Sequence, residues 1–370
     1  MMKSKRLRVM HIIPTMKTGG AERLLLDIIK RIDQTKFEAS VVIFKEKGEL
    51  YEQLMKLPVH VFFIPKKWKI DFGNIWKLKN IIKNQQPDII HTHLGGDMYG
   101  RLLAHRLGIS VVSTEHNINV DESKLITVVK RKTARFATRI IAVSKAVQED
   151  MINRYRIDPK KIVVIYNGID CDVFQRIEDT ERKYDFSDKK NIFRIGAAGR
   201  LVEQKGFSFL IKAISLVKDE YFQIVCEIVG DGYLRSDLEA LIKSYHLEKN
   251  VILSGVCSDM ISFYKSINLL VMPSLWEGLG ITVLEAGALE IPVVASSVDG
   301  LIEIIDDSVN GLLVQPGNAR DIADKIINVI TNYQRSLDRA RLLAEKVRTT
   351  FSITDMVRHY ENIYEDIASK

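Results

Sequence analysis

The first part of the fold is decided by Val9-Met10-His11-Ile12-Ile13-Pro14, an apolar run that is followed by the turn Thr18-Gly19-Gly20. After the glycines, apolar residues recur at helical spacing, at Ala21, Leu24, Leu25, Ile28, Ile29 and Ile32. A short apolar run, a glycine turn and an amphipathic helix together predict the strand–turn–helix unit of an α/β protein.

The same rhythm continues along the N-terminal half of the chain. Six further apolar runs are separated by segments long enough for crossover helices, which predicts a mainly parallel sheet. The expected strands are 39–44, 59–64, 89–93, 111–114, 140–143 and 162–165.

A second α/β domain is predicted to begin near residue 191, after a polar, charge-dense stretch at 176–190 that is typical of a linker. Its expected strands are 193–198, 224–229, 251–253, 269–272, 293–295 and 311–314, with helices at 207–217, 234–245 and 322–330. The chain is therefore predicted to hold two doubly wound, Rossmann-like domains, 1–175 and 191–350, that face each other across a ligand-binding cleft. The last segment, 351–370, has apolar residues at helical spacing and needs an apolar surface, which the first domain would offer.

Composition excludes several classes of protein. With 46% hydrophobic and 27% charged residues among 370, the chain is neither collagen-like nor disordered. The three cysteines, Cys171, Cys226 and Cys257, lack the paired spacing of a disulfide framework or a four-ligand zinc site. No apolar stretch approaches the roughly 20 residues of a spanning helix, and the N-terminal run is too short for a signal peptide, so we expect a cytoplasmic protein.

Charge is distributed unevenly between the two halves. Residues 1–175 contain 31 Lys and Arg against 18 Asp and Glu, whereas the remainder is net acidic. An excess of this sign suggests an anionic membrane surface or nucleic acid as a partner, unless the surface is simply solvated. The cations concentrate at Lys66-Lys67-Trp68-Lys69 with Trp76, Lys77 and Lys79, and at Lys130-Arg131-Lys132 with Arg135 and Arg139. Because aromatic rings accompany the cations and no RNA-binding motif is present, we predict peripheral binding to an anionic membrane and no nucleic acid.

The most informative motif is Glu277-Gly278-Leu279-Gly280-Ile281-Thr282-Val283-Leu284-Glu285, which follows a predicted strand. The glycines let backbone N–H groups approach a ligand, and a helix that begins near Gly280 directs its positive end toward an anion such as a diphosphate. Glutamates beside such an anion are suited to accept hydrogen bonds from sugar hydroxyls. The alternative is that both are capping or surface residues.

A second turn, from Gly199-Arg200-Leu201 to Lys205-Gly206, follows the first strand of the second domain. A guanidinium and an ammonium a few residues apart suit the two phosphates of a nucleotide diphosphate, although loop cations are often only solvated.

Four motifs in this order resemble glycosyltransferase family 4: Thr18-Gly19-Gly20-Ala21-Glu22-Arg23, Asn167-Gly168-Ile169-Asp170, the Arg200–Lys205 turn and the Glu277–Glu285 motif. The resemblance spans nearly the whole chain and implies the GT-B fold and transfer, with retention of configuration, from a nucleotide diphosphate sugar. Because Arg200, Lys205 and the helix end near Gly280 would meet the charge of the diphosphate, we expect that the reaction needs no bound metal and no further cofactor. A UDP-sugar donor and a lipid-linked or other glycan acceptor are the expected substrates, for cell-surface polysaccharide or glycolipid synthesis.

The resemblance also implies roles for single residues. Glu277 looks like the residue that binds donor-sugar hydroxyls, Glu285 like the one that holds the ribose, and His116 like the histidine that faces the sugar. Arg200 and Lys205 look like the pair that stabilises the leaving diphosphate. The expected donor site also includes Gly19, Gly20, Gly199, Gly278, Leu279, Gly280 and Ile281.

Two possible metal motifs are interpreted otherwise. Asp170-Cys171-Asp172 spells D-x-D, but Asp170 closes a predicted turn. For His91-Thr92-His93 we expect strand-end packing, because strand neighbours point to opposite faces and no third ligand is apparent nearby. The competing functions are a nucleotide-sugar epimerase or hydrolase of similar fold, and a non-enzymatic protein that binds nucleotide sugars or nucleic acid.

Overall fold

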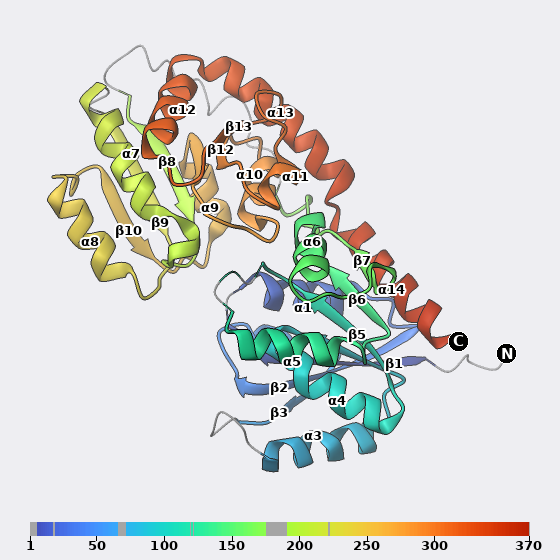
Figure 1. Cartoon of the computed structure of the whole chain (residues 1–370). Helices are drawn as coiled ribbons and strands as arrows, with labels where there is room; N and C mark the ends of the chain where they lie inside the picture. Colours follow the sequence, from blue (N-terminus) through green and yellow to red (C-terminus); the bar gives the residue numbers. More distant parts are fainter. Residues whose placement is uncertain are drawn as a thin grey trace. The chain divides into compact units, whose positions relative to one another are not determined.

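The computed structural model describes residues 6–17, 19–65, 72–118, 120, 122–174, 191–220 and 223–369. The chain divides into two compact units (Figure 1). Unit 1 comprises Met1–Gly168 and Ile353–Lys370, and unit 2 comprises Ile169–Ser352. The changeover therefore lies at 168/169, a few residues before the predicted limit of 175, and the predicted linker 176–190 lies outside the described residues.

Unit 1 is built on a seven-stranded sheet with the order β3-β2-β1-β4-β5-β6-β7, in which all pairs are parallel. Its strands are β1 (Leu7–Thr15), β2 (Phe37–Glu46), β3 (His60–Phe63), β4 (Ile89–His93), β5 (Ser110–Glu115), β6 (Arg139–Ala142) and β7 (Ile162–Val164). Every strand predicted for this half is present, with ends that differ by a few residues at most.

Helices cover both faces of the first sheet. One face packs against α1 (Gly20–Arg31) and α14 (Ile353–Ala368), and the other packs against α3 (Phe72–Gln85) and α4 (Asp97–Leu107). The remaining helical elements of the unit are α2 (Tyr51–Met55), α5 (Lys124–Ala134), α6 (Lys145–Asn153), and the short η1 (Leu94–Gly96) and η2 (Pro159–Lys161).

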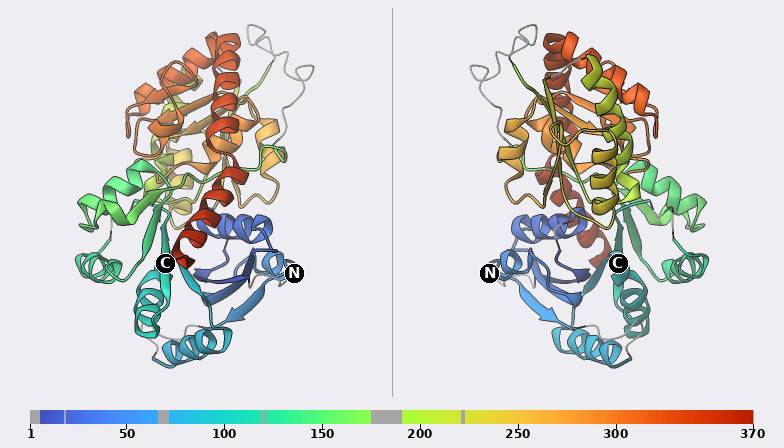
Figure 2. Two further views of the ribbon diagram at one scale, coloured as in Figure 1. Left: turned by 90° about the vertical axis from the view of Figure 1, so that its right-hand side faces the viewer. Right: turned by 90° about the vertical axis from the view of Figure 1, so that its left-hand side faces the viewer.

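The C-terminal helix α14 belongs to unit 1 although it follows the whole of unit 2. It lies beside α1, as two orientations of the chain show (Figure 2). Its buried side chains, Ile353, Met356, Val357, Tyr360, Tyr364 and Ile367, recur every three or four residues and join the core beneath β1, β4 and β5. The apolar spacing seen in the sequence is thus used to cover the first sheet.

Unit 2 is built on a six-stranded parallel sheet with the order β10-β9-β8-β11-β12-β13. The strands are β8 (Phe193–Ala198), β9 (Ile224–Val229), β10 (Val251–Gly255), β11 (Leu269–Met272), β12 (Val293–Ser296) and β13 (Leu312–Val314). The helices are α7 (Phe207–Glu220), α8 (Arg235–Ser244), α9 (Met260–Ser266), α10 (Ile281–Ala288), α11 (Leu301–Ile304), α12 (Ala319–Thr331) and α13 (Tyr333–Thr350), with η4 at Glu203–Lys205.

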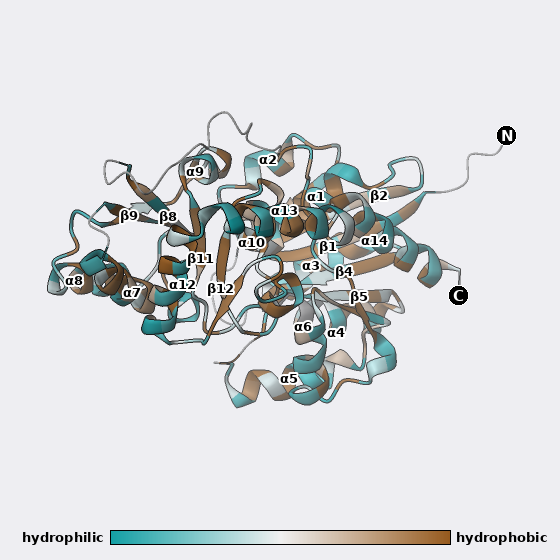
Figure 3. Ribbon diagram, turned by 90° about the horizontal axis from the view of Figure 1, so that it is seen from above, coloured by the Kyte–Doolittle hydropathy of each residue, from teal (hydrophilic) through white to brown (hydrophobic). Residues whose placement is uncertain are grey.

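The central strands of unit 2 are apolar on both faces, as expected for a parallel sheet that helices cover on both sides. Figure 3 colours β11 and β12 brown along their length, and all residues of both strands are buried. The predicted pair of Rossmann-like α/β domains is confirmed. In both sheets the strand order reverses beside the first strand, between β1 and β4 and between β8 and β11, and ligands of such sheets bind next to this switch point.

Candidate active site

The loops that follow β8 and β11 lie side by side in unit 2, because these two strands are neighbours in the sheet. The first loop carries Arg200 and Lys205, and the second carries Glu277 and leads into α10. Two hydrogen bonds join the loops: Leu275 donates its backbone N–H to the Gln204 carbonyl over 2.7 Å, and Gln204 Nε2 donates to the Trp276 carbonyl over 3.0 Å. The predicted cationic turn and the predicted glutamate motif are therefore parts of one site.

Lys205 and Glu277 form the central contact of this site. Lys205 Nζ lies 2.5 Å from Glu277 Oε2, and both side chains are only about one-eighth exposed, at 13% and 12%. Ser274 Oγ donates to the same carboxylate oxygen over 3.2 Å. A partly buried ion pair with an additional hydroxyl donor is a well-defined charged centre beside the start of α10.

Two glycines make the close approach of the loops possible. The aliphatic part of the Lys205 side chain passes over Gly199, so a Cβ at position 199 would lie 3.0 Å from Lys205 Cε. Gly206 ends η4 with φ 63°, in the left-handed region, and its backbone packs against the Pro273 carbonyl. A side chain at either position would push Lys205 or the β11 loop out of place.

Helix α10 begins after Gly280, as the sequence predicts. Gly280 is the N-cap residue and has φ 95°, a conformation that glycine adopts at little cost. Ile281 opens the helix and is half-buried, whereas Leu279 is 3% exposed and packs in the core. The Leu279 side chain is therefore not available to a ligand, and Gly278 has no side chain. A ligand at this helix end would meet the backbone of these two residues.

Glu285 lies in the second turn of α10 and is buried, with 5% exposure. It accepts a hydrogen bond of 2.7 Å from the Tyr264 hydroxyl. Tyr264 comes from α9 and is fully buried. Sequence reasoning missed Tyr264 because nothing in the sequence marked residues 260–266 as an element of the site.

The Arg200 side chain, by contrast, is exposed and makes no ion pair or hydrogen bond with another residue in the described parts of the chain. It follows β8 directly and lies five residues before Lys205, on the same loop. The structure thus brings Lys205, Glu277 and Glu285 together with Gly199, Gly278 and Gly280, and leaves the Arg200 side chain in solvent.

The glycine turn of unit 1 resembles the start of α10, because it also leads from a glycine directly into a helix. Gly19 is the N-cap of α1 in an extended conformation, and Gly20 is the first helical residue. Thr15 Oγ1 donates to Glu22 over 2.9 Å across this turn, and Glu22 is buried. Thr18, the other residue of the motif, lies outside the described residues.

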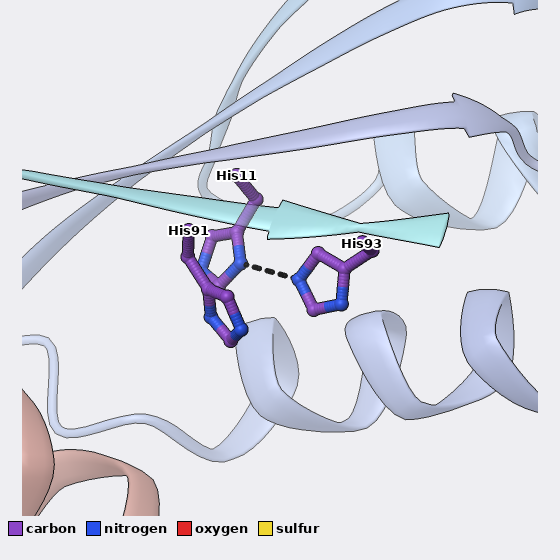
Figure 4. A group of neighbouring side chains, drawn as sticks. All are labelled: His11, His91 and His93. Carbon is purple, nitrogen blue, oxygen red and sulfur yellow. Dashed lines mark hydrogen bonds between the residues drawn. The ribbon is translucent and has the colours of Figure 1, made fainter. Parts of the chain in front are cut away.

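A cluster of histidines lies on the α1 and α14 side of the first sheet (Figure 4). His11, His91 and His93 are fully buried, and each offers one ring nitrogen within 4.8 Å of those of the other two. Our expectation that no third ligand lies near His91 and His93 is therefore wrong. The two residues stand two positions apart on β4 and share a face, and the register of β1 with β4 places His11 opposite His91.

Hydrogen bonds occupy most of the ring nitrogens in this cluster. His11 Nδ1 lies 3.2 Å from His93 Nε2, and His93 Nδ1 lies 3.2 Å from His116 Nε2. His91 Nδ1 and Nε2 meet the hydroxyls of Tyr364, at 2.6 Å, and Thr114, at 2.8 Å. Among the described residues, His11, His91 and His93 are the group with the ligand spacing of a metal site, but as they stand they form a hydrogen-bonded network.

Burial keeps these imidazoles neutral. It lowers the pKa of His11 to about 3 and that of His116 to about 4, the latter against the opposing effect of the Glu115 carboxylate. The pKa values of His91 and His93 are lowered well below the usual value by burial and by the neighbouring imidazoles. His116, at the end of β5 as predicted, is thus a neutral side chain at neutral pH.

The D-x-D sequence forms a local turn. Asp172 donates its backbone N–H to Asp170 Oδ1 over 3.1 Å, and Val173 donates to the Asp170 carbonyl over 3.1 Å. This agrees with the turn predicted at Asp170, and the absence of a metal role stays a prediction.

Comparisons with known proteins identify the family of the chain. Residues 18–173 match the family model "Glycosyltransferase Family 4", and residues 177–348 match "Glycosyl transferases group 1". An uncharacterized glycosyltransferase of Methanocaldococcus jannaschii is 32% identical over 70% of each chain. The chain is a family 4-like glycosyltransferase. The competing interpretations as an epimerase, a hydrolase or a binding protein are thereby set aside.

One further relative and one solved structure align with nearly the whole of the glycosyltransferase. An Escherichia coli enzyme named UDP-Gal:alpha-D-GlcNAc-diphosphoundecaprenol alpha-1,3-galactosyltransferase is 26% identical over 98% of this chain and 97% of its own. The crystal structure of Anabaena Alr3699/HepE in complex with UDP-glucose superposes with a TM-score of 0.84, at 23% identity, over 98% of this chain and all of the other. The structural match confirms the GT-B fold.

The basic surface of the glycosyltransferase differs from the sequence-based description. Lys66, Lys67, Trp68 and Lys69 lie outside the described residues, and Trp76 on α3 is 66% exposed. Lys130 does not belong to the surface group, because it turns inward to Glu122, at 2.6 Å, and Glu115, at 4.0 Å. None of the described helices is both long enough and apolar enough to cross a bilayer.

Proposed function

We propose that this glycosyltransferase moves a sugar from a UDP-sugar onto a lipid-linked or other glycan acceptor, with retention of configuration, in cell-surface polysaccharide or glycolipid synthesis. The observation that carries the proposal is the arrangement around the start of α10. Lys205 and Glu277 are paired there, and Glu285 is buried two turns into the motif. Cations, the backbone N–H groups at the start of a helix and carboxylates that can accept hydrogen bonds from hydroxyls together fit a sugar diphosphate.

In this proposal each group meets a different part of the donor. The α10 N-terminus, Lys205 and Arg200 neutralise the diphosphate as it leaves. A diphosphate competes with Glu277 for the Lys205 ammonium, and the carboxylate released from the ion pair accepts hydrogen bonds from the sugar hydroxyls. Glu285 accepts hydrogen bonds from the ribose in the way that it accepts one from Tyr264. His116 faces the sugar as a neutral imidazole.

The donor and the acceptor class are supported by the named relatives. The E. coli relative is named for transfer from UDP-Gal to a diphosphoundecaprenol-linked sugar, and the Anabaena protein was crystallised with UDP-glucose. Retention of configuration rests on the resemblance to family 4.

Peripheral membrane binding is supported by α5. Leu125, Ile126 and Val128 are 75%, 43% and 46% exposed, which is unusual for large apolar side chains. Exposed Lys124, Arg131, Lys132 and Arg135 surround them, and residues 123–135 contain no acidic residue. Apolar side chains amid cations fit the interface of an anionic membrane, at the surface of which a lipid-linked acceptor would be presented.

The first experiment tests the reaction. Purified protein is incubated with UDP-glucose, UDP-galactose and UDP-N-acetylglucosamine, each with and without membrane extract. We expect UDP release that requires the extract, and a product whose anomeric NMR coupling matches that of the donor. Isomerised donor without extract, or an inverted linkage, would contradict the proposal.

The second experiment tests the membrane. Sedimentation with vesicles should require anionic lipid and should fall in high salt, because each cation near the surface contributes about 1 kcal/mol within a Debye length of roughly 8 Å. Leu125→Ser with Val128→Ser should weaken binding, whereas the matched change Val256→Ser, at a site in unit 2 that is 69% exposed, should not. Equal sedimentation with neutral vesicles, or tight RNA binding in place of lipid binding, would refute it.

A further inference from the structure

Helix α5 turns large apolar side chains away from the core of unit 1. A helix that covers a sheet ordinarily directs its apolar stripe toward the core. In α5, however, Leu125 and Val128 are exposed, and residues three positions apart share a face of the helix. Of the residues of α5, all of which the structure describes, only Thr133 and Ala134 at the C-terminal end are buried. Apolar packing therefore does little to fix the rotation of α5 about its axis.

Lys130 of the same helix points inward. It stands two positions after Val128, and residues two apart on an α-helix point in nearly opposite directions. Its Nζ lies 2.6 Å from Glu122 Oε1 and 4.0 Å from Glu115 Oε2, and its side chain is only 15% exposed. It also lies 5.4 Å from the centre of the Tyr155 ring. The helix thus encloses a cation on one side and exposes apolar side chains on the other, the reverse of the usual arrangement.

Lys130 belongs to a row of four alternating charges, Arg101, Glu115, Lys130 and Glu122, which we call the charge cluster. Arg101 comes from the neighbouring helix α4, is buried, and lies 3.3 Å from Glu115 through Nη2 (Figure 1). The second oxygen of Glu122 accepts a hydrogen bond of 2.9 Å from the Tyr155 hydroxyl. Two cations and two carboxylates therefore balance each other, and they do so only while Lys130 points inward.

The charge cluster selects one rotation of α5. A rotation by about half a turn would remove Leu125 and Val128 from water, which favours it. It would also separate Lys130 from Glu122 and leave a poorly exposed carboxylate without its cation, which opposes it strongly. Burial acts against the charge of Lys130, but Glu115 and Glu122 outweigh it and raise the pKa of Lys130 above its usual value. Selecting one arrangement among several is the best attested use of buried charged and polar groups.

We propose that Lys130 is a positioning residue that fixes the rotation of α5 through Glu122 and Glu115, so that Leu125 and Val128 stay turned outward to an anionic lipid surface. The inference rests on the proposed function for the nature of that surface. Lys130 itself touches no lipid in this role. A change inside the charge cluster that keeps the net charge should therefore still weaken membrane binding.

The rotation can be measured without lipid, as the rate at which N-ethylmaleimide labels Leu125→Cys. The test background is Lys130→Met with Glu122→Gln, because Lys130→Met alone would leave Glu122 without a cation and could prevent folding. Labelling should slow about tenfold in the double variant, which corresponds to about 1.4 kcal/mol in favour of the rotated helix. Peptide mass spectrometry reads position 125 separately from Cys226, which is buried and should stay unlabelled. Lys130→Arg retains the charge and should be labelled at the wild-type rate.

A matched control pair comes from the same unit. Lys36 and Glu365 form an exposed ion pair of 3.0 Å, so Lys36→Met with Glu365→Gln applies the same two substitutions away from α5. It should leave the labelling of position 125 unchanged.

Sedimentation with anionic vesicles provides the second measurement. The Lys130→Met and Glu122→Gln variant keeps the net charge and all exposed side chains of α5. Its binding should nevertheless fall as far as that of Leu125→Ser with Val128→Ser, whereas the control pair should bind as the wild type does.

Three outcomes would overturn the inference. The first is wild-type labelling of position 125 in the double variant, and the second is vesicle binding that this variant retains. The third is labelling of Cys226 together with position 125, because the charge cluster would then hold the fold and not the rotation. If labelling slows as expected but the wild type does not bind anionic vesicles, only the membrane part of the proposed function fails. If the wild type binds and labelling does not change, only the role of Lys130 fails.

Discussion

The polar centre of unit 1 consists of neutral imidazoles, whereas that of unit 2 is an ion pair. Both centres lie on strands or loops at the switch point of a parallel sheet, beside a helix that begins after a glycine. In unit 1, burial lowers the pKa values of four histidines, whereas in unit 2 Lys205 and Glu277 are paired with each other and keep about one-eighth of each side chain exposed. The same scaffold thus holds a group of neutral side chains in one unit and an ion pair in the other.

The largest expected difference between the two units is in how much stability each loses at acidic pH. The folded pKa values of His11 and His116, about 3 and about 4, lie below the unfolded value of 6.5, so the unfolded chain binds more protons between these limits. The contribution of these two histidines to the free energy of unfolding is complete above pH 6.5 and is lost as the pH falls toward 4. Each histidine contributes on the order of 3 to 5 kcal/mol.

This difference can be measured by hydrogen exchange, corrected for the intrinsic effect of pH. Peptides from β4 and β5 should lose protection between pH 6.5 and 4, while those from β11 and β12 keep it, because the single histidine of unit 2, His246, is exposed. Simultaneous loss of protection in both units would contradict the comparison.

The next largest effect concerns the cations of unit 2. Lys205→Ala or Arg200→Ala should each lower kcat by a factor of about 100 to 1,000, or roughly 2.7–4 kcal/mol, if a preorganised donor to the leaving diphosphate is lost. The exposed Lys243 on α8 provides the control, since Lys243→Ala removes the same charge from the same unit. Unchanged turnover of both variants at saturating donor would rule out the assignment.

The two glutamates should separate nucleotide binding from sugar binding. Glu285→Ala should weaken UDP binding by about 10- to 100-fold, the value of hydrogen bonds to a charged group, whereas Glu277→Ala should weaken recognition of the sugar and leave UDP affinity nearly intact. Calorimetry with UDP and with the UDP-sugar measures both. Tyr264→Phe is the control for Glu285, because it removes the hydroxyl that this carboxylate already binds. An equal loss of UDP affinity in both glutamate variants would contradict this division.

Much of the fold was predictable because each strand is a continuous apolar run. The bounds of 89–93, 193–198, 224–229 and 269–272 are those expected, since turn residues close these runs on both sides. Helix α13 was missed, because its 18 residues are rich in charge and their buried stripe is narrow.

The residues of the candidate site could be predicted where they lie close together in the sequence, on one loop. The glutamate motif and its helix start could be recognised locally, and Lys205 could be proposed as its neighbour from the parallel sheet. The histidine cluster could not, because it joins β1, β4 and β5 through register, and no single segment contains more than two of its members. Tyr364 was expected to be buried by its helical spacing, but its hydrogen bond to His91 depends on where α14 returns.

The smallest expected effect is that of a chelator, which should leave the transfer rate unchanged. In unit 2 the diphosphate would be neutralised by Arg200, Lys205 and the α10 N-terminus, so no carboxylate-held ion is required. In unit 1 a metal at His11, His91 and His93 would have to displace hydrogen bonds to Tyr364 or Thr114 and bring two positive charges into a buried region. Excess EDTA, followed by dialysis, tests both units at once, with Zn²⁺ added back to one sample and Mg²⁺ or Mn²⁺ to another. If Mg²⁺ or Mn²⁺ restores a lost activity, an ion held by Asp170 and Asp172 would neutralise the diphosphate. If Zn²⁺ alone restores it, the buried histidines of unit 1 would be metal ligands, and the polar centre of unit 1 would carry the charge of the ion.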